Sequence, residues 1–131
     1  MTTPFWCLLA AFLAIWLARI PVFVAIARSE QSFDNREPAR QLASLEGFGA
    51  RAVAAHRGLT DGFAPFAASV LVAHLAGADP RRSAVLAVAF VVAQIVYVLA
   101  YLANVDYLRS LVWLVGFFTV LGLFGLAAGA G

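Results

Sequence analysis

The chain has 131 residues, a length that suits a single domain. It is 63% hydrophobic and 12% charged, with a mean hydropathy of +0.90, which excludes an ordinary soluble globule and is typical of a polytopic membrane protein. The nine basic residues are all arginine and the net charge is +2, but these arginines lie in short segments between apolar runs, without a basic stripe or recognition motif, so nucleic-acid binding is excluded.

The first long apolar run covers residues 4–27, about the length that a bilayer requires. We expect it to stay in the membrane, because no basic region precedes it and no small-residue cleavage site follows. Arg19 interrupts this run, with Pro21 close behind. A charge at that depth either faces the interior of a helix bundle or extends to the interface, and the sequence leaves both possibilities open. The lone Cys7 excludes a disulfide framework.

A polar segment, residues 28–48, follows the first run and holds most of the acidic residues. Asn35 and Pro38 indicate a turn, because proline disfavours a helical residue before it. The residues after Pro38 suit a short surface helix. The segment is either a solvated loop or a lid over a site at the membrane surface.

The second hydrophobic run covers residues 50–77 and begins with a charged stretch. Charges that lead directly into a membrane helix are unfavourable unless they are paired, hydrated or functional. Arg57 and Asp61 are four residues apart, so they can form an ion pair on one helix face. Three uncharged residues fall near the same face: Ala54, Gly58 and Pro65. We take this face as the candidate site.

A turn of helix-breaking residues, Gly-Ala-Asp-Pro, separates the second run from the third, residues 83–103. Gln94, Tyr97 and Tyr101 follow one stripe of this third helix. Polar groups in hydrocarbon are unfavourable unless they are hydrogen-bonded, so we expect the stripe to face protein rather than lipid.

The fourth run covers residues 107–129 and begins after a short polar turn. Arg109, Ser110 and Trp113 lie in its first two turns. His74, near the end of the second run, has no second metal ligand at helical spacing, so we expect no metal site.

Four spans place both termini on one side of the membrane. Most arginines lie in or beside the first and third loops, and only Arg81 and Arg82 lie in the second. The positive-inside bias therefore predicts an inner-membrane topology in which the first and third loops are cytoplasmic and both termini are periplasmic. The polar residues that converge towards the cytoplasmic end are Arg57, Asp61, Tyr101, Arg109 and Ser110.

Several stretches together resemble one family. These are PFWCLL near the N-terminus, FDNREPAR in the first loop, RAVAAHR and APFAASVLVAHLAG in the second run, QIVYVLAYL in the third and LRSLVW in the fourth. They resemble the membrane-associated proteins in eicosanoid and glutathione metabolism, the MAPEG family, and look most like its small bacterial inner-membrane branch. The resemblance covers nearly the whole chain.

The resemblance implies that residues 1–131 form a single domain, an all-α, integral membrane four-helix bundle. It further implies that three copies of this bundle assemble as a homotrimer. It also implies that glutathione binds between protomers near the cytoplasmic side, where an arginine at the start of the fourth helix activates the thiol. By motif, that arginine is Arg109. The residues implied to bind glutathione are Arg57, Asp61, Tyr97, Tyr101 and Ser110.

The chain departs from the family pattern at four positions. Ala54 replaces a usual arginine, Gly58 a usual asparagine and Gln94 the usual arginine of the third helix. Trp113 stands where some members carry a tyrosine. Each lost carboxylate anchor or buried amide partner weakens ligand binding by about 1–3 kcal/mol, so two or three of them reduce glutathione affinity by orders of magnitude.

Two functions follow from these observations. The first is a glutathione transferase or peroxidase that acts on lipophilic electrophiles arriving through the lipid. The second is a non-catalytic membrane trimer that binds a lipid or a protein partner, for which the lost anchors are no disadvantage. Solute transport is disfavoured because the sequence has no inverted repeat or pair of broken helices.

Overall fold

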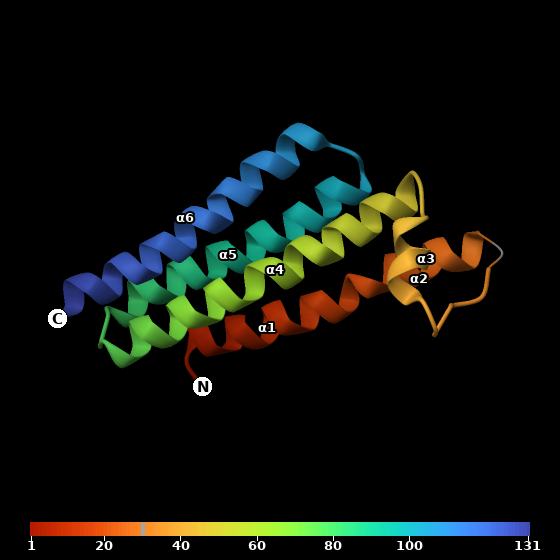
Figure 1. The fold of residues 1–131 in the computed structure, drawn as a ribbon. Coiled ribbons are helices and arrows are strands. Elements are labelled where there is room, and N and C mark those ends of the chain that lie inside the picture. Colours follow the sequence, from red (N-terminus) through yellow and green to blue (C-terminus); the bar gives the residue numbers. More distant parts are fainter. Residues whose placement is uncertain (30) are drawn as a thin grey trace.

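The computed structural model describes residues 1–29 and 31–131, and all regular elements in these ranges are helices. The helices are α1 (Thr3–Leu17), α2 (Arg19–Arg28), α3 (Pro38–Ala43), α4 (Phe48–Leu75), α5 (Pro80–Leu102) and α6 (Asp106–Ala130). Figure 1 shows α1, α4, α5 and α6 side by side, with both termini at one end of the bundle and α3 at the other.

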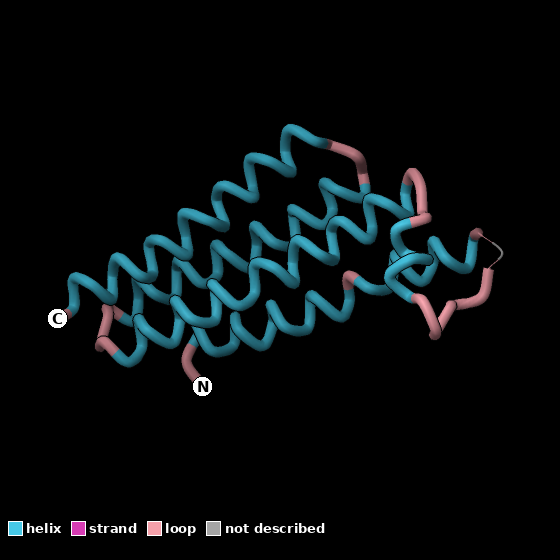
Figure 2. Tube along the Cα trace, in the orientation of Figure 1, coloured by secondary structure: helices cyan, strands magenta, loops and turns pink. Residues whose placement is uncertain are grey.

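Four helical segments are long and apolar enough to cross a membrane: Thr3–Arg28, Phe48–Leu75, Pro80–Leu102 and Asp106–Ala130. This arrangement confirms the predicted all-α membrane bundle, and the chain is an integral membrane protein. The loop between α2 and α4 and the turn between α5 and α6 lie at the same end (Figure 2). The trimeric assembly stays a prediction.

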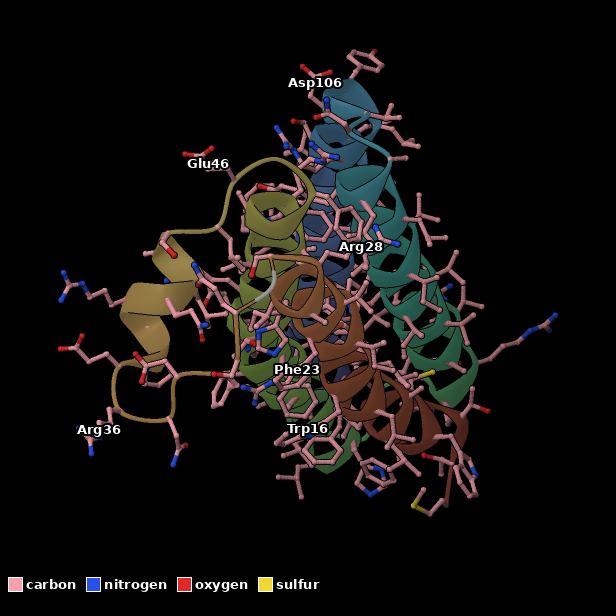
Figure 3. The ribbon with its side chains drawn as sticks, turned by 90° about the vertical axis from the view of Figure 1, so that its right-hand side faces the viewer. Trp16, Phe23, Arg28, Arg36, Glu46 and Asp106 are labelled. Carbon is pink, nitrogen blue, oxygen red and sulfur yellow. The ribbon has the colours of Figure 1, made fainter. Side chains whose placement is uncertain are left out.

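The first spanning segment is interrupted at Ala18, where α1 ends and α2 begins. Pro21 has no backbone N–H, so it leaves the carbonyl of Leu17 without its usual helical donor and disturbs the helix there. The half-buried Arg19 follows the break. Its guanidinium carbon lies 5.5 Å from the ring centroid of Trp16 and 5.8 Å from that of Phe23. Figure 3 shows these two rings on the same flank of the bundle.

Defined turns connect the last three helices. Gly77 adopts a φ of 73°, and the Asp79 carboxylate accepts a hydrogen bond of 2.7 Å from the backbone N–H of Arg82 at the start of α5. At the other end of α5, Asn104 adopts a φ of 59°, and the N–H of Val105 donates to the carbonyl of Ala100 at 2.8 Å. This pattern is a standard helix C-terminal motif.

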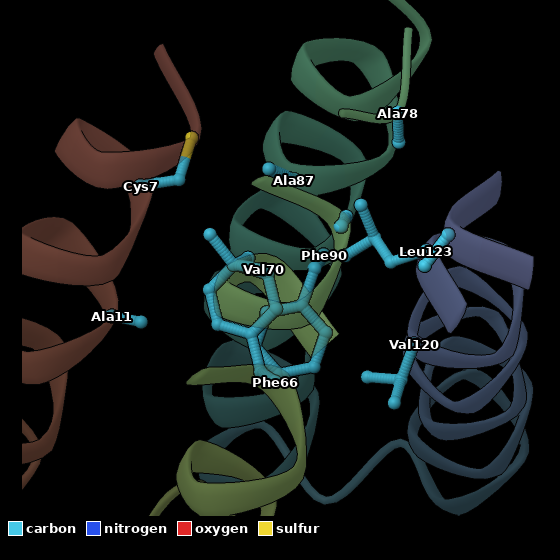
Figure 4. Close-up of a cluster of buried hydrophobic side chains, with 11 residues drawn as sticks. Cys7, Ala11, Phe66, Val70, Ala78, Ala87, Phe90, Val120 and Leu123 are labelled. Carbon is cyan, nitrogen blue, oxygen red and sulfur yellow. The ribbon is translucent and has the colours of Figure 1, made fainter. Parts of the chain in front are cut away.

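The core lies where α4, α5 and α6 pack together, towards the end that carries the termini. Phe66 and Phe90 stack at a centroid distance of 3.9 Å, and Phe66 and Leu123 are fully buried (Figure 4). Cys7 is also buried against this cluster, so its thiol is packed. The tight core fixes three helices in one half of the bundle and leaves a cavity between them in the other half.

Candidate functional site

A cavity of about 700 Å³ lies between α4, α5 and α6, near the end of the bundle that carries α3. This volume is within the range of ordinary ligand pockets. Its lining residues from α4, α5 and α6 include four predicted site residues, namely Arg57, Asp61, Tyr97 and Tyr101. Ala54, Gly58 and Pro65 also line it, so the polar face of α4 is turned towards the cavity as the helical spacing predicts.

Arg57 and Asp61 do not form the ion pair that their spacing permits. Among the described residues, the only ion pair within 4.0 Å joins Arg40 to Glu37, at 3.2 Å. A helical pair four residues apart contributes only about 0.3–0.5 kcal/mol, and the order with the cation first is the weaker one. The two side chains are exposed at the cavity and leave a cation and an anion, one helical turn apart, free to contact a ligand.

Tyr97 packs directly against the backbone of Gly58. A Cβ atom placed on Gly58 would overlap the Tyr97 hydroxyl and would lie 2.6 and 2.7 Å from its Cε1 and Cζ atoms. Contacts below 3.0 Å require one of the two groups to move. The absence of a side chain at Gly58 therefore allows the phenol of α5 to reach the polar face of α4.

Arg109 reaches the site through Tyr101 rather than through the cavity itself. Its guanidinium carbon lies 4.4 Å from the Tyr101 ring centroid, and the Tyr101 and Tyr97 rings meet edge to face at 5.2 Å. Arg109 and Ser110 do not line the cavity, and Ser110 is exposed.

Residues in and beside α3 form the outer edge of the cavity, although no sequence motif had pointed to them. Leu42, Ala43 and Leu45 line it, whereas residues 31–40 are exposed. The first part of the segment is therefore a solvated loop, and its last part borders the cavity; a lid over the site stays a prediction. Leu42 and Leu45, three residues apart in a polar stretch, were the available signal.

Hydrogen bonds hold this segment in a defined shape. The Gln41 side chain donates to the carbonyl of Ser32 and accepts from the N–H of Asp34, both at 2.9 Å. The Asp34 carboxylate accepts from the backbone N–H groups of Arg36 and Glu37 at 2.9 and 3.2 Å. The leucines that border the cavity are thus attached to an ordered loop.

The inner part of the cavity is bounded by apolar groups and one amide. Gln94 lines it, together with Phe90 of α5 and with Trp113 and Phe117 of α6. The Trp113 and Phe117 rings are parallel, 5.8 Å apart, and form a wall without closing the space. The predicted stripe of Gln94, Tyr97 and Tyr101 therefore faces protein and a cavity rather than bulk lipid.

The family comparison agrees with these features. The model of the MAPEG family matches residues 3–129, nearly the whole chain. No curated protein and no solved structure matches it. Because the match extends across all four spanning segments and confirms the resemblance of the sequence motifs, the chain belongs to the MAPEG family.

Proposed function

We propose that this protein is a glutathione-dependent transferase or peroxidase for lipophilic electrophiles, and that the cavity between α4, α5 and α6 holds the glutathione. The family in general is known for its use of glutathione. The observation that carries the proposal is that Arg57 and Asp61 line one open cavity without pairing with each other. Such an arrangement suits a ligand with both a carboxylate and an ammonium group.

The residues present fit this tripeptide at one of its ends. An arginine binds a carboxylate through strong charge-assisted hydrogen bonds, and Asp61 provides the complementary anion for the ammonium group. The hydroxyl groups of Tyr97 and Tyr101 can hydrogen-bond the peptide amides. Arg57 is the only arginine that lines the cavity within the described residues, so the second carboxylate of glutathione requires another cation.

Bound glutathione would supply a thiol as the nucleophile. We propose that Arg109 stabilises its ionised form, since a fixed cation favours a nearby anion. The guanidinium lies over the ring of Tyr101, which lines the cavity, at 4.4 Å from the ring centroid. Ser110, on the same turn of α6, would bind the ligand only if the ligand extends beyond the cavity.

The assembly that fits this function is a homotrimer in which a neighbouring protomer completes the site. We propose that it lies in a bacterial inner membrane, with the first and third loops cytoplasmic and both termini periplasmic. The distribution of arginines supports this orientation, because the loop between α2 and α4 and the first turn of α6, which carry Arg36, Arg40 and Arg109, lie at the end of the bundle opposite the turn that leads into α5 at Arg81 and Arg82. Lipid then surrounds the bundle and gives lipophilic substrates access to the cavity.

A second candidate is a non-catalytic trimer that binds a lipid or a protein partner. The apolar wall of Trp113 and Phe117 favours it, as does the absence of a cationic side chain at Ala54. In this case Arg57 would contact the headgroup of an anionic lipid.

Calorimetric titration of the purified protein with glutathione in detergent separates the two candidates. Saturable binding that is lost in Arg57→Ala and in Arg109→Ala would support the first function. The matched control is Arg81→Ala, which removes an exposed arginine at the opposite end of the bundle and should bind normally. Absence of binding at millimolar glutathione would overturn the glutathione proposal and leave the second candidate.

A further inference from the structure

A groove of about 600 Å³ lies on the outer side of the bundle, between α5 and α6. The residues that line it are all alanine or valine, namely Ala84, Val85, Val88, Ala89, Val92, Ala93, Val96, Val112 and Val115. Figure 1 shows the two helices side by side along this length. The groove shares Val112 with the cavity of the candidate site but lies on the opposite side of α5 from Tyr97 and Tyr101.

An arginine pair lies at one end of the groove. Arg81 and Arg82 line a smaller hollow between the same two helices, and Val85 lines both this hollow and the groove. Val85 follows Arg81 by four residues and Arg82 by three, so both arginines lie on the helix face that leads into the groove. The cationic hollow and the apolar groove are therefore continuous along α5.

Arg81 and Arg82 are exposed and available to an external anion. Within residues 1–29 and 31–131, the single ion pair closer than 4.0 Å joins Arg40 to Glu37. Asp79 is near the arginine pair, but its carboxylate accepts from the backbone N–H of Arg82 and so caps the helix. A cation in the first turn of a helix opposes the helix dipole, so the pair does not serve to stabilise α5.

The groove has the length of one acyl chain. From Val85 to Val96, α5 rises about 16 Å, which is about half the thickness of the hydrocarbon core of a bilayer. The groove begins at the end of the bundle that carries the chain termini and ends near the middle of the membrane (Figure 1). It thus covers the depth that a phospholipid chain occupies in the leaflet at that end.

We infer that this surface binds an anionic phospholipid, with its phosphate at Arg81 and Arg82 and one acyl chain in the groove between α5 and α6. The guanidinium groups donate charge-assisted hydrogen bonds to the phosphate oxygens. The two arginines and Asp79 together carry a charge of +1, which suits a phosphate diester with one negative charge. The inference goes beyond the proposed function, because it involves neither glutathione nor the residues proposed to bind it.

Native mass spectrometry of the protein in detergent tests the headgroup. The protein is mixed with equal amounts of dioleoyl phosphatidylglycerol and dioleoyl phosphatidylcholine, which differ only in the headgroup. Phosphatidylglycerol should be retained about 5–30-fold more, because each arginine near a membrane surface favours an anionic lipid about fivefold. The double variant Arg81→Ala with Arg82→Ala should bring this ratio close to one. The matched control is Arg36→Ala with Arg40→Ala, which removes two exposed arginines at the opposite end and should keep the ratio.

Ala89→Leu tests the acyl chain in the same measurement. The larger side chain takes up space in the groove and should reduce retention of phosphatidylglycerol about fivefold or more, the loss expected from one or two buried methylene groups. The matched control is Ala68→Leu, the same substitution at an exposed alanine of α4 that lines neither hollow. If Ala89→Leu fails to fold, Val92→Trp takes its place, since Val92 is 54% exposed at the groove.

Equal retention of the two lipids by the unaltered protein would overturn the inference. A preference that survives the loss of Arg81 and Arg82, or that falls equally when Arg36 and Arg40 are replaced, would also overturn it. Undiminished retention in Ala89→Leu with a changed number of chains in the complex would assign the groove to a second copy of the chain instead. The glutathione titration uses different residues, so either experiment can fail without affecting the result of the other.

Discussion

Tyr97 of α5 lies directly on the backbone of Gly58 in α4, and its ring occupies the place where any other residue would carry its side chain. The contact joins the two helices at the level of the polar face that carries Arg57. It also explains why the glycine is compatible with a ligand site. The polar group that α4 lacks at this position is present on α5 as a phenol.

Replacing Gly58 by alanine or asparagine should force Tyr97 out of its position. Overpacking of this kind costs about 1–3 kcal/mol of folding free energy. We expect a lower thermal unfolding midpoint in detergent for Gly58→Ala. The double variant Gly58→Ala with Tyr97→Ala should recover most of the loss, because the conflicting group is removed. Equal losses in the presence and absence of the Tyr97 ring would contradict the close contact.

Arg57→Ala and Asp61→Asn should have independent effects on stability, because the two side chains are not paired. A double-mutant cycle measured by thermal unfolding should give a coupling energy below about 0.5 kcal/mol. Arg57→Ala should nevertheless weaken glutathione binding about 10–100-fold, since it removes charge-assisted hydrogen bonds. A coupling energy above about 1 kcal/mol would show that the pair closes in solution.

Arg109→Lys tests whether the stacked guanidinium matters beyond its charge. Lysine keeps the positive charge but loses the planar group that covers Tyr101 at 4.4 Å. We expect the ultraviolet absorbance of bound thiolate to fall in Arg109→Lys, and to fall similarly in Tyr101→Leu, which removes the ring. If only the charge is needed, Arg109→Lys will retain the full signal, and stacking will have no part in thiol activation.

The stacked pair Phe66 and Phe90 should be the main source of stability in the shared core. Phe90→Ala removes a ring that is only 3% exposed, and substitutions of this kind cost about 3–5 kcal/mol. We expect a large decrease in the unfolding midpoint, measured by circular dichroism in detergent. The control is Phe118→Ala on α6, where the ring is 62% exposed and its loss should have little effect. Similar decreases for both variants would contradict this location of the core.

The sequence was sufficient to predict the polar face of α4 and the stripe on α5. Helical spacing determines which residues share a face, so Arg57 and Asp61 could be placed together, as could Tyr97 with Tyr101. The resemblance added the roles expected of Tyr97 and Arg109. The spacing left an Arg57–Asp61 ion pair possible, and the structure shows none, because spacing permits a contact without making it favourable. The close contact of Tyr97 with Gly58 could not be predicted, because the distance between helices depends on packing that no single-helix pattern contains.

The edge of the cavity was similarly inaccessible to sequence reasoning. Leu42 and Leu45 follow a polar loop, and their approach to the site depends on the hydrogen bonds of Gln41 with residues nine and seven positions earlier. The local sequence indicates a short helix there, but it does not indicate how that helix is oriented relative to the cavity.

Both chain ends lie at the end of the bundle opposite α3, away from the mouth of the cavity (Figure 1). A tag on either end therefore attaches the molecule to a sensor surface in the same pose, with the cavity facing the buffer. Reporter enzymes that are active on only one side of a membrane should likewise be both active or both inactive when fused to the two ends in living cells. Pairs of fusions can thus measure the sidedness of the protein without disturbing the residues that line its cavity.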